Sequence, residues 1–322
     1  MKKSIYNALG VMLIAALLPA CAQSPAEQAD DGKVSVVATI FTPYDFTREI
    51  AGDSADITML LPPASESHSF EPTPRDIITI QNCDVFIYVG GESDEWVNEV
   101  LESIDTPRMR IITLMDCVET VEEEIVEGME EEEEEEHEGG ETNEDAEYDE
   151  HVWTSPRNAK LIVQKISDAL CEADAANAET YKQNTEAYLA RLDELDSEFQ
   201  AVVDGAARKT IVFGDRFPFR YFADAYGLEY YAAFPGCSTE TEASAATVKF
   251  LIDKINDEKI PVVFHIELSN EKMANTISEA TGAKVLLLHA CHNITQDDFT
   301  AAKSYIDLMT ANVEALREAL RL

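Results

Sequence analysis

The sequence predicts an α/β protein with two βα lobes, each with a central, mostly parallel sheet, joined by a long rigid helix. Apolar, β-branched runs alternate with helix-like stretches in both halves of the chain, and a helical tract lies between them. Such alternation is typical of parallel sheets covered by helices. The chain has 322 residues, 45% of them hydrophobic, which is enough for two domains or one large one.

The first predicted lobe covers residues 33–156. Its strands are expected in four runs rich in Val and Ile, at residues 34–40, 55–61, 83–90 and 109–114. Helix-like stretches separate these runs near residues 44–51, 73–81 and 95–104. Because a helix follows each strand, neighbouring strands are expected to run parallel.

The second predicted lobe covers residues 205–322 and repeats this order. Its strands are expected at residues 209–214, 228–234, 261–266 and 284–289. Its helices are expected near residues 219–226, 244–257, 270–281 and 301–320.

The tract between the lobes, residues 157–204, is expected to be helical. Large apolar side chains recur there at spacings of seven, four, three and four residues: Tyr181, Tyr188, Leu192, Leu195 and Phe199. This spacing places them on one face of a helix. We expect a long helix that packs against both lobes and forms a stiff hinge between them.

The N-terminus has the features of a secretion signal over residues 1–20. Lys2 and Lys3 precede an apolar run at residues 5–18 that is too short for a membrane-spanning helix. Cys21 follows a small residue, an order that resembles a lipoprotein processing box in which Cys21 is lipidated; an ordinary signal with an incidental cysteine is the alternative. Residues 21–32 are typical of a tether. We expect an extracytoplasmic protein, lipid-anchored to the outer face of the cell membrane or periplasmic.

The charge of the chain is strongly acidic and unevenly distributed. A net charge of -39 argues against nucleic acid as a partner, because phosphate binding needs a basic surface. Residues 119–150 contain 19 acidic residues and no Lys or Arg, so we expect a disordered acidic loop there. One interpretation is a solvated insertion without a role. The other is a low-affinity collector of divalent cations to which His137 contributes.

Four of the six histidines follow apolar, strand-like runs: His68, His151, His289 and His292. Neutral imidazole is a ligand for zinc, copper, iron or nickel, and strand ends are where α/β proteins place ligand sites. The sequence therefore predicts a metal site built from distant segments. His265 lies inside a predicted strand and is interpreted as a core residue rather than a ligand.

Several segments resemble one family of transport proteins. They are SHSFEPTPRD with His68, YDEHVWTSPRNA with His151, TGAKVLLLHACHN with His289, and SYIDLMTANVEALREAL near the C-terminus. In this order they resemble the zinc and manganese solute-binding proteins of ABC importers, the ZnuA-like or cluster A-I family. The resemblance implies that His68 is the first metal ligand and His151 the second, and that His289 takes the place of an acidic ligand. His292 is a possible fourth ligand.

The chain departs from the family at the third ligand. The family has a His or Glu before a Phe-x-Tyr stretch, and the segment FGDRFPFRYFADAYGL has Arg216 there. A guanidinium cannot ligate a cation. We expect Arg216 to pair with a carboxylate such as Glu240 or Glu242, and Asp215 is a further candidate ligand.

Five cysteines remain apart from Cys21, an odd number, so at least one is free or pairs between chains. The resemblance implies a disulfide between Cys237 and Cys291. The alternative is that Cys291 is a thiolate ligand beside His289. Cys83 and Cys171 are interpreted as small apolar residues.

The resemblance implies a monomeric, lipid-anchored receptor that binds Zn²⁺ and delivers it to the permease of an ABC transporter. Nitrogen-rich ligation favours Zn²⁺ over Mn²⁺, and no nucleophile-base pair or phosphate loop suggests an enzyme. One alternative is a zinc hydrolase with Glu267 as its base, although the chain lacks an HExxH helix. Another is a surface protein for cell adhesion or metal buffering.

Overall fold

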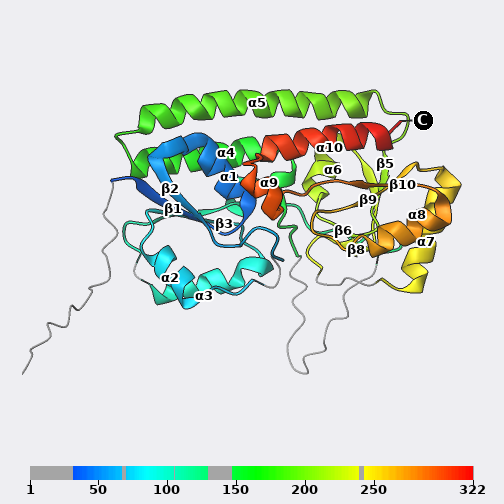
Figure 1. Cartoon of the computed structure of the whole chain (residues 1–322), viewed down its shortest axis with the longest axis horizontal. Coiled ribbons are helices and arrows are strands. Elements are labelled where there is room, and N and C mark those ends of the chain that lie inside the picture. Colours follow the sequence, from blue (N-terminus) through cyan, green and yellow to red (C-terminus); the bar gives the residue numbers. More distant parts are fainter. Residues whose placement is uncertain (1–31, 67–69, 105, 130–146, 239–242, 322) are drawn as a thin grey trace, which may run out of the picture. The chain divides into compact units, whose positions relative to one another are not determined.

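The first lobe is built on four parallel strands, shown in blue to cyan in the computed structural model (Figure 1). The model describes residues 32–66, 70–104, 106–129, 147–238 and 243–321. Predictions that concern the signal segment, Cys21 and its tether, His68, His137, Glu240 and Glu242 lie outside the described residues.

The sheet of the first lobe has the strand order β2-β1-β3-β4. The strands are β1 (Val34–Ala38), β2 (Ala55–Met59), β3 (Val85–Tyr88) and β4 (Arg110–Thr113). Alternate side chains of β1 and β3 enter two different core clusters, so both faces of the sheet are buried. This explains why these strands have continuous apolar runs.

Helices cover both faces of this sheet (Figure 1). On one side lies α1 (Phe41–Ala51), and on the other lie α2 (Pro74–Gln81) and α3 (Glu95–Ser103). Helix α2 begins at Thr73, which forms a capping box with Asp76. Short 3₁₀ turns occupy Gly52–Ser54, Glu92–Asp94, Met115–Cys117 and Val152–Thr154.

The second lobe is also parallel, but its regular pairing is shorter than predicted. Strand β5 (Thr210–Val212) pairs with β7 (Glu229–Tyr231), and β9 (Val262–His265) pairs with β10 (Lys284–Leu287). The two pairs meet at one bridge between Phe213 and Phe264, with Gly214 N donating to Phe264 O at 2.9 Å. A further short pair joins β6 (Arg216–Phe217) to β8 (Phe234–Pro235).

The four predicted helices of the second lobe are present, and a short helix that was not predicted, α9 (Gln296–Thr300), precedes the last of them. The predicted four are α6 (Arg220–Tyr226), α7 (Ala245–Glu258), α8 (Lys272–Thr281) and α10 (Tyr305–Ala319). Helices α7 and α8 pack on one face of β5 and β9, in a cluster that includes Leu251, Ile255 and Ile277.

The tract between the lobes forms two helices, α4 (Pro156–Ala173) and α5 (Ala178–Asp204). The chain turns at Asp174, whose carboxylate accepts hydrogen bonds from Asn177 N and from Tyr181 Oη at 2.8 Å. The predicted apolar stripe belongs to α5 and is buried. Asn184 of α5 donates to Ile50 O in α1, and Phe199 packs against Phe222 in α6, so the long helix packs against both lobes as predicted.

The chain from Lys33 to Leu322 forms one compact unit. Its main core cluster runs from β1 and β3 through α4 and α5 to α10. The lobe limits at residues 156 and 205 therefore stay predictions. Among the described residues, no helix is long and apolar enough to cross a membrane.

A buried acidic residue joins α1 to the start of α10. Asp45 is fully buried, accepts a hydrogen bond from Tyr305 N at 2.7 Å and pairs with Arg48 at 2.5 Å. Burial raises the pKa of Asp45 from 3.8 to about 6, although Arg48 acts in the opposite direction.

We predict that Asp45 makes metal-free protein less stable as the pH rises from 4 to 6. The folded state holds the proton more tightly than the unfolded state, so its stabilising effect is complete below about pH 4 and is lost through pH 6. The free energy of unfolding of the wild type, relative to Asp45→Asn, should fall by on the order of 2 kcal/mol over this range. Urea unfolding at each pH measures it. The exposed Asp53→Asn should follow the wild-type curve, and a parallel curve for Asp45→Asn would refute the prediction.

Candidate metal centre

The loop that follows β10 is held by two side chains from neighbouring elements. Glu267, just after β9, accepts hydrogen bonds from Ala290 N at 2.7 Å and from His292 N at 2.9 Å. Asn312 of α10 bonds both the N–H and the carbonyl of His289 at 2.8 Å. The backbone that carries His289 and His292 is therefore fixed before any ligand binds.

His151 is buried beside a carboxylate. Its backbone N donates to Asp149 Oδ1 at 2.7 Å, and its ring Nδ1 lies 3.2 Å from the same oxygen. Burial lowers the pKa of His151, but Asp149, Glu150 and Glu123 together raise it above its usual value. With Nδ1 donating to Asp149, the neutral ring has its lone pair on Nε2, as in the carboxylate–histidine arrangement of metal sites.

Trp153 joins the end of the first lobe to the loop after β10. Its side chain is fully buried, and Nε1 donates to Ala290 O at 2.7 Å. Its carbonyl accepts from Tyr305 Oη at 2.8 Å. The indole ring lies 5.5 Å from the ring of His151 and 5.2 Å from that of His292, so it fixes one side of both.

The rings of His151 and His292 lie 5.3 Å apart, centroid to centroid. Zinc binds imidazole nitrogen at about 2 Å in a tetrahedral site, so two ligating rings have centroids about 5 Å apart. The observed separation matches this value.

Both rings line a cavity at the carboxyl ends of the strands, where α/β folds place ligands. Residues in or just after β6, together with segments that follow β2, β4, β8, β9 and β10, form its wall: Ser65, Glu66, His151, Arg216, Pro218, Gly236, Ile266, Glu267, Leu268, Ala290, His292 and Asn293. His68 comes two residues after Glu66 in the sequence but lies outside the described residues.

His289 and His265 are placed elsewhere. His289 does not line this cavity; its Nδ1 accepts from Cys291 N at 3.0 Å, and its buried Nε2 has no hydrogen-bond partner within the described chain. His265 Nδ1 bonds its neighbour Ile266 O at 2.9 Å. The loop after β10 thus brings His292, rather than His289, to His151.

Arg216 pairs with a carboxylate that the sequence did not suggest. Its Nη2 lies 3.3 Å from Glu66 Oε2, and its Nη1 donates to Ser238 O at 3.1 Å. The side chain of Asp215 accepts from Arg216 N and from Ile266 N. Arg216 thus forms an ion pair between the segment after β2 and the segment after β5, on the wall of the cavity.

The predicted disulfide between Cys237 and Cys291 is corrected, because both are free thiols in the structure. Their surroundings explain this. Cys291 is fully buried in the main core, with its Sγ 3.8 Å from His289 O, and burial raises the pKa of its thiol. It does not line the cavity as the alternative of a thiolate ligand requires. Cys237 lies beside the acidic segment.

The acidic segment is ordered at both ends, contrary to the expectation of disorder throughout residues 119–150. Glu122 and Tyr148 form an antiparallel bridge, Glu123 N donates to Glu147 O at 2.8 Å, and Asp149 N donates to Val121 O at 3.0 Å. We call residues 121–123 and 147–149 the stem. The centre of the segment, 130–146, lies outside the described residues.

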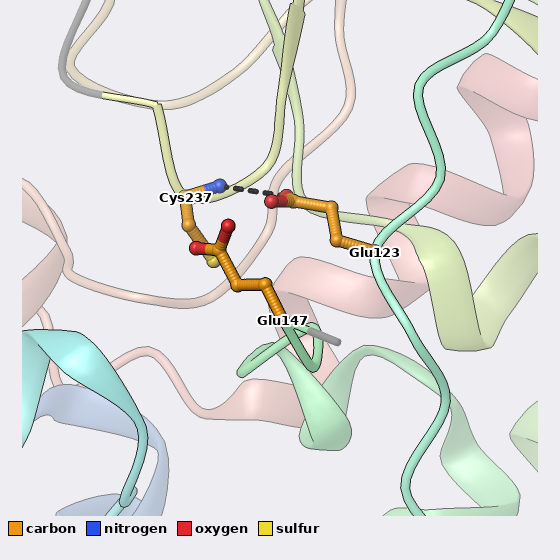
Figure 2. Close-up of side chains that lie close together, drawn as sticks. All are labelled: Glu123, Glu147 and Cys237. Carbon is orange, nitrogen blue, oxygen red and sulfur yellow. Dashed lines mark hydrogen bonds between the residues drawn. The ribbon is translucent and has the colours of Figure 1, made fainter. Parts of the chain in front are cut away.

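The stem brings Glu123 and Glu147 to Cys237, an arrangement that sequence reasoning missed (Figure 2). Cys237 N donates to Glu123 Oε1 at 3.1 Å. Burial raises the pKa of the Cys237 thiol well above its usual value, and Asp149 and Glu123 raise it further. No spacing in the sequence predicts this cluster, because Cys237 lies 90 or more residues after Glu123 and Glu147.

One family model and several curated proteins match most of this chain. Residues 36–319 match the model of the ZnuA family, described as zinc-uptake complex component A, periplasmic. The zinc-binding lipoprotein AdcA of Streptococcus pneumoniae (strain R6) is 32% identical over 95% of this chain, which spans 59% of the length of AdcA. The high-affinity zinc uptake system protein ZnuA of Bacillus subtilis is 31% identical over 97% of both chains.

Solved structures show the same fold. The Zn(II)-bound ZnuA-like domain of Streptococcus pneumoniae AdcA is 29% identical, with a TM-score of 0.73 over 90% of this chain and 99% of that domain. The metal-dependent lipoprotein YcdH from Bacillus subtilis is 28% identical, with a TM-score of 0.74 over 89% of this chain and all of that one. On these grounds the chain belongs to the ZnuA family.

Proposed function

We propose that this protein is an extracytoplasmic receptor that binds Zn²⁺ in the cavity lined by His151 and His292 and delivers it to an ABC permease. The observation that carries the proposal is the 5.3 Å approach of these two rings at the carboxyl ends of the strands. The zinc-binding and zinc-uptake relatives support the choice of metal.

The proposed ligand set has four histidines, and the observations that support each one differ. His151 binds through Nε2 while Asp149 holds Nδ1, which fixes the tautomer. His292 binds from a loop whose backbone Glu267 holds. His68 joins from the loop after Glu66 on the grounds of its motif. His289 is proposed on its motif alone, because its ring lies outside the cavity wall.

We infer a binding role rather than catalysis. A hydrolase would need a general base aimed at a metal-bound water. Glu267, the candidate base, already accepts two backbone hydrogen bonds from the loop after β10. Its carboxylate therefore serves to hold His292 in place.

The proposed location and partner follow from the start of the chain and from its relatives. Cys21 would carry a lipid that anchors a monomer to the outer face of the membrane, with residues 21–32 as a tether. The anchor keeps the receptor near its permease, where the effective concentration is high. The name of the pneumococcal relative, a lipoprotein, supports the anchor.

The first prediction concerns the ligands. His151→Ala and His292→Ala should each weaken Zn²⁺ binding by about 100-fold or more, because each removes a nitrogen from the ion. His265→Ala is the matched control and should change affinity less than threefold, roughly the effect of a remote residue. Competition with a chelator measures all three. Equal losses in the three variants would show that the site has been misplaced.

His289→Ala tests the motif separately. If the ring acts only within the fold, the variant should lose stability in urea unfolding while its Zn²⁺ affinity stays close to that of His265→Ala. A loss of affinity as large as that of His151→Ala would instead show that His289 moves into the cavity on binding.

A second prediction concerns metal preference. Imidazole nitrogen favours Zn²⁺ over Mn²⁺, which prefers oxygen ligands, so Zn²⁺ should displace Mn²⁺ from the purified chain at equal concentrations. Equilibrium dialysis with both metals measures the bound ratio. Displacement of Zn²⁺ by Mn²⁺ would refute the zinc assignment.

A third prediction separates the cavity from the acidic segment. Replacing residues 130–146 by a short Gly-Ser linker keeps the stem and removes most of the acidic run. We expect tight, stoichiometric Zn²⁺ binding at the cavity to remain and the weak binding contributed by residues 130–146 to disappear, as measured by calorimetric titration. Loss of the tight site would support a metal-buffering protein instead.

A further inference from the structure

The stem and the loop after β8 bring together three side chains that can ligate a cation. Glu123 and Glu147 lie on the two arms of the stem, and Cys237 approaches them from a distant part of the chain (Figure 2). One ligand atom from each, two carboxylate oxygens and the Cys237 sulfur, lie within 4.8 Å of one another. A metal ion with bonds of about 2.0–2.3 Å to oxygen and sulfur could bind all three atoms after small rotations of these side chains.

The backbone around the cluster is fixed by hydrogen bonds. Glu123 N donates to Glu147 O at 2.8 Å, which sets the distance between the two arms. Cys237 N donates to Glu123 Oε1, which sets the position of the thiol relative to the stem. Glu123 and Cys237 are half-buried and Glu147 is exposed, so the cluster is open to solvent on one side.

A buried carboxylate oxygen behind the cluster is left without a donor. Asp149 is 1% exposed; its Oδ1 accepts from His151, but its Oδ2 has no hydrogen-bond partner within the described chain. Oδ2 would lie 3.1 Å from a Cβ atom at Gly236, so it reaches the backbone next to Cys237. A buried acceptor without a donor destabilises the fold, and a nearby cation would offset this cost.

We propose that Glu123, Glu147 and Cys237 form a second metal site, distinct from the histidine cavity, for a divalent cation that accepts a thiolate. Asp149 supplies negative charge from the buried side. The thiolate selects ions of the Zn²⁺, Co²⁺ and Cd²⁺ class over Ca²⁺ and Mg²⁺, which take oxygen ligands. On binding, the Cys237 S–H bond breaks, a sulfur–metal bond forms, and the proton leaves to solvent on the open side at Glu147.

The position of this stem site suggests its use. It lies where the acidic run 130–146 joins the fold, and the Asp149 carboxylate connects it to His151 through Oδ1. A cation collected by the acidic run would therefore meet the stem before the cavity. This use rests on the proposed function, whereas the stem site itself does not.

Co²⁺ titration of the reduced, metal-free full chain tests the proposal, because a cobalt–thiolate bond gives a charge-transfer absorption band. We expect the band to grow to one equivalent, to vanish in Cys237→Ser and to weaken at least about tenfold in apparent affinity in Glu123→Gln. Cys117→Ser is the matched control, since Cys117 is also half-buried but bonds Thr113 O, and it should keep the band.

Three results would each overturn the stem site. They are absence of the band in the wild type, survival of the band in Cys237→Ser, and a Cys237 that cannot be labelled because it is in a disulfide. His292→Ala separates the two proposals. It should lose tight Zn²⁺ binding and keep the cobalt–thiolate band. If His292→Ala and His151→Ala kept tight Zn²⁺ binding while Cys237→Ser lost the band, the proposed cavity would fail and the stem site would stand.

Discussion

The hydrogen bond from Trp153 Nε1 to Ala290 O is the interaction on which the candidate site depends. It joins the chain leaving the first lobe to a loop of the second lobe, 137 residues away. Both groups are buried, so breaking the bond would leave a donor and an acceptor unsatisfied, at about 1–3 kcal/mol each. Because His151 precedes Trp153 by two residues and His292 follows Ala290 by two, this bond holds together the two backbone segments that carry the rings.

The loop after β10 shows why a motif alone does not tell which histidine lines the cavity. His289 aligns with the position of the family's acidic ligand, yet His292 lines the cavity. Cys291 between them has φ of 60°, in the left-handed region that a side chain rarely adopts. On either side of Cys291, Ala290 N and His292 N both donate to the carboxylate of Glu267. A sequence shows the three-residue spacing but not this backbone conformation.

The parts that were predictable and those that were not differ in physical origin. Strands β1, β3 and β9 appear in the sequence as apolar runs because local pattern and burial agree, and the stripe of α5 is visible for the same reason. The pairing of Arg216 with Glu66 spans 150 residues and depends on how two loops meet. The separation of Cys237 and Cys291 likewise depends on long-range packing, because Cys291 lies in the main core cluster and Cys237 lies beside the stem. Contacts of this kind have no periodicity for sequence reasoning to detect.

The carboxylate of Asp149 contacts His151 through one oxygen and lies near the proposed stem site with the other. Its Oδ1 lies 3.2 Å from His151 Nδ1 and orients the ring, and the carboxylate is buried near Glu123 and Glu150. Burial raises the pKa of both of these glutamates, and the nearby charge of Asp149 raises it further. A chain of net charge -39 can hold such a group of carboxylates inside its fold only with compensation. One cation at the histidines and one at the stem would supply that positive charge, each on the side of a different Asp149 oxygen.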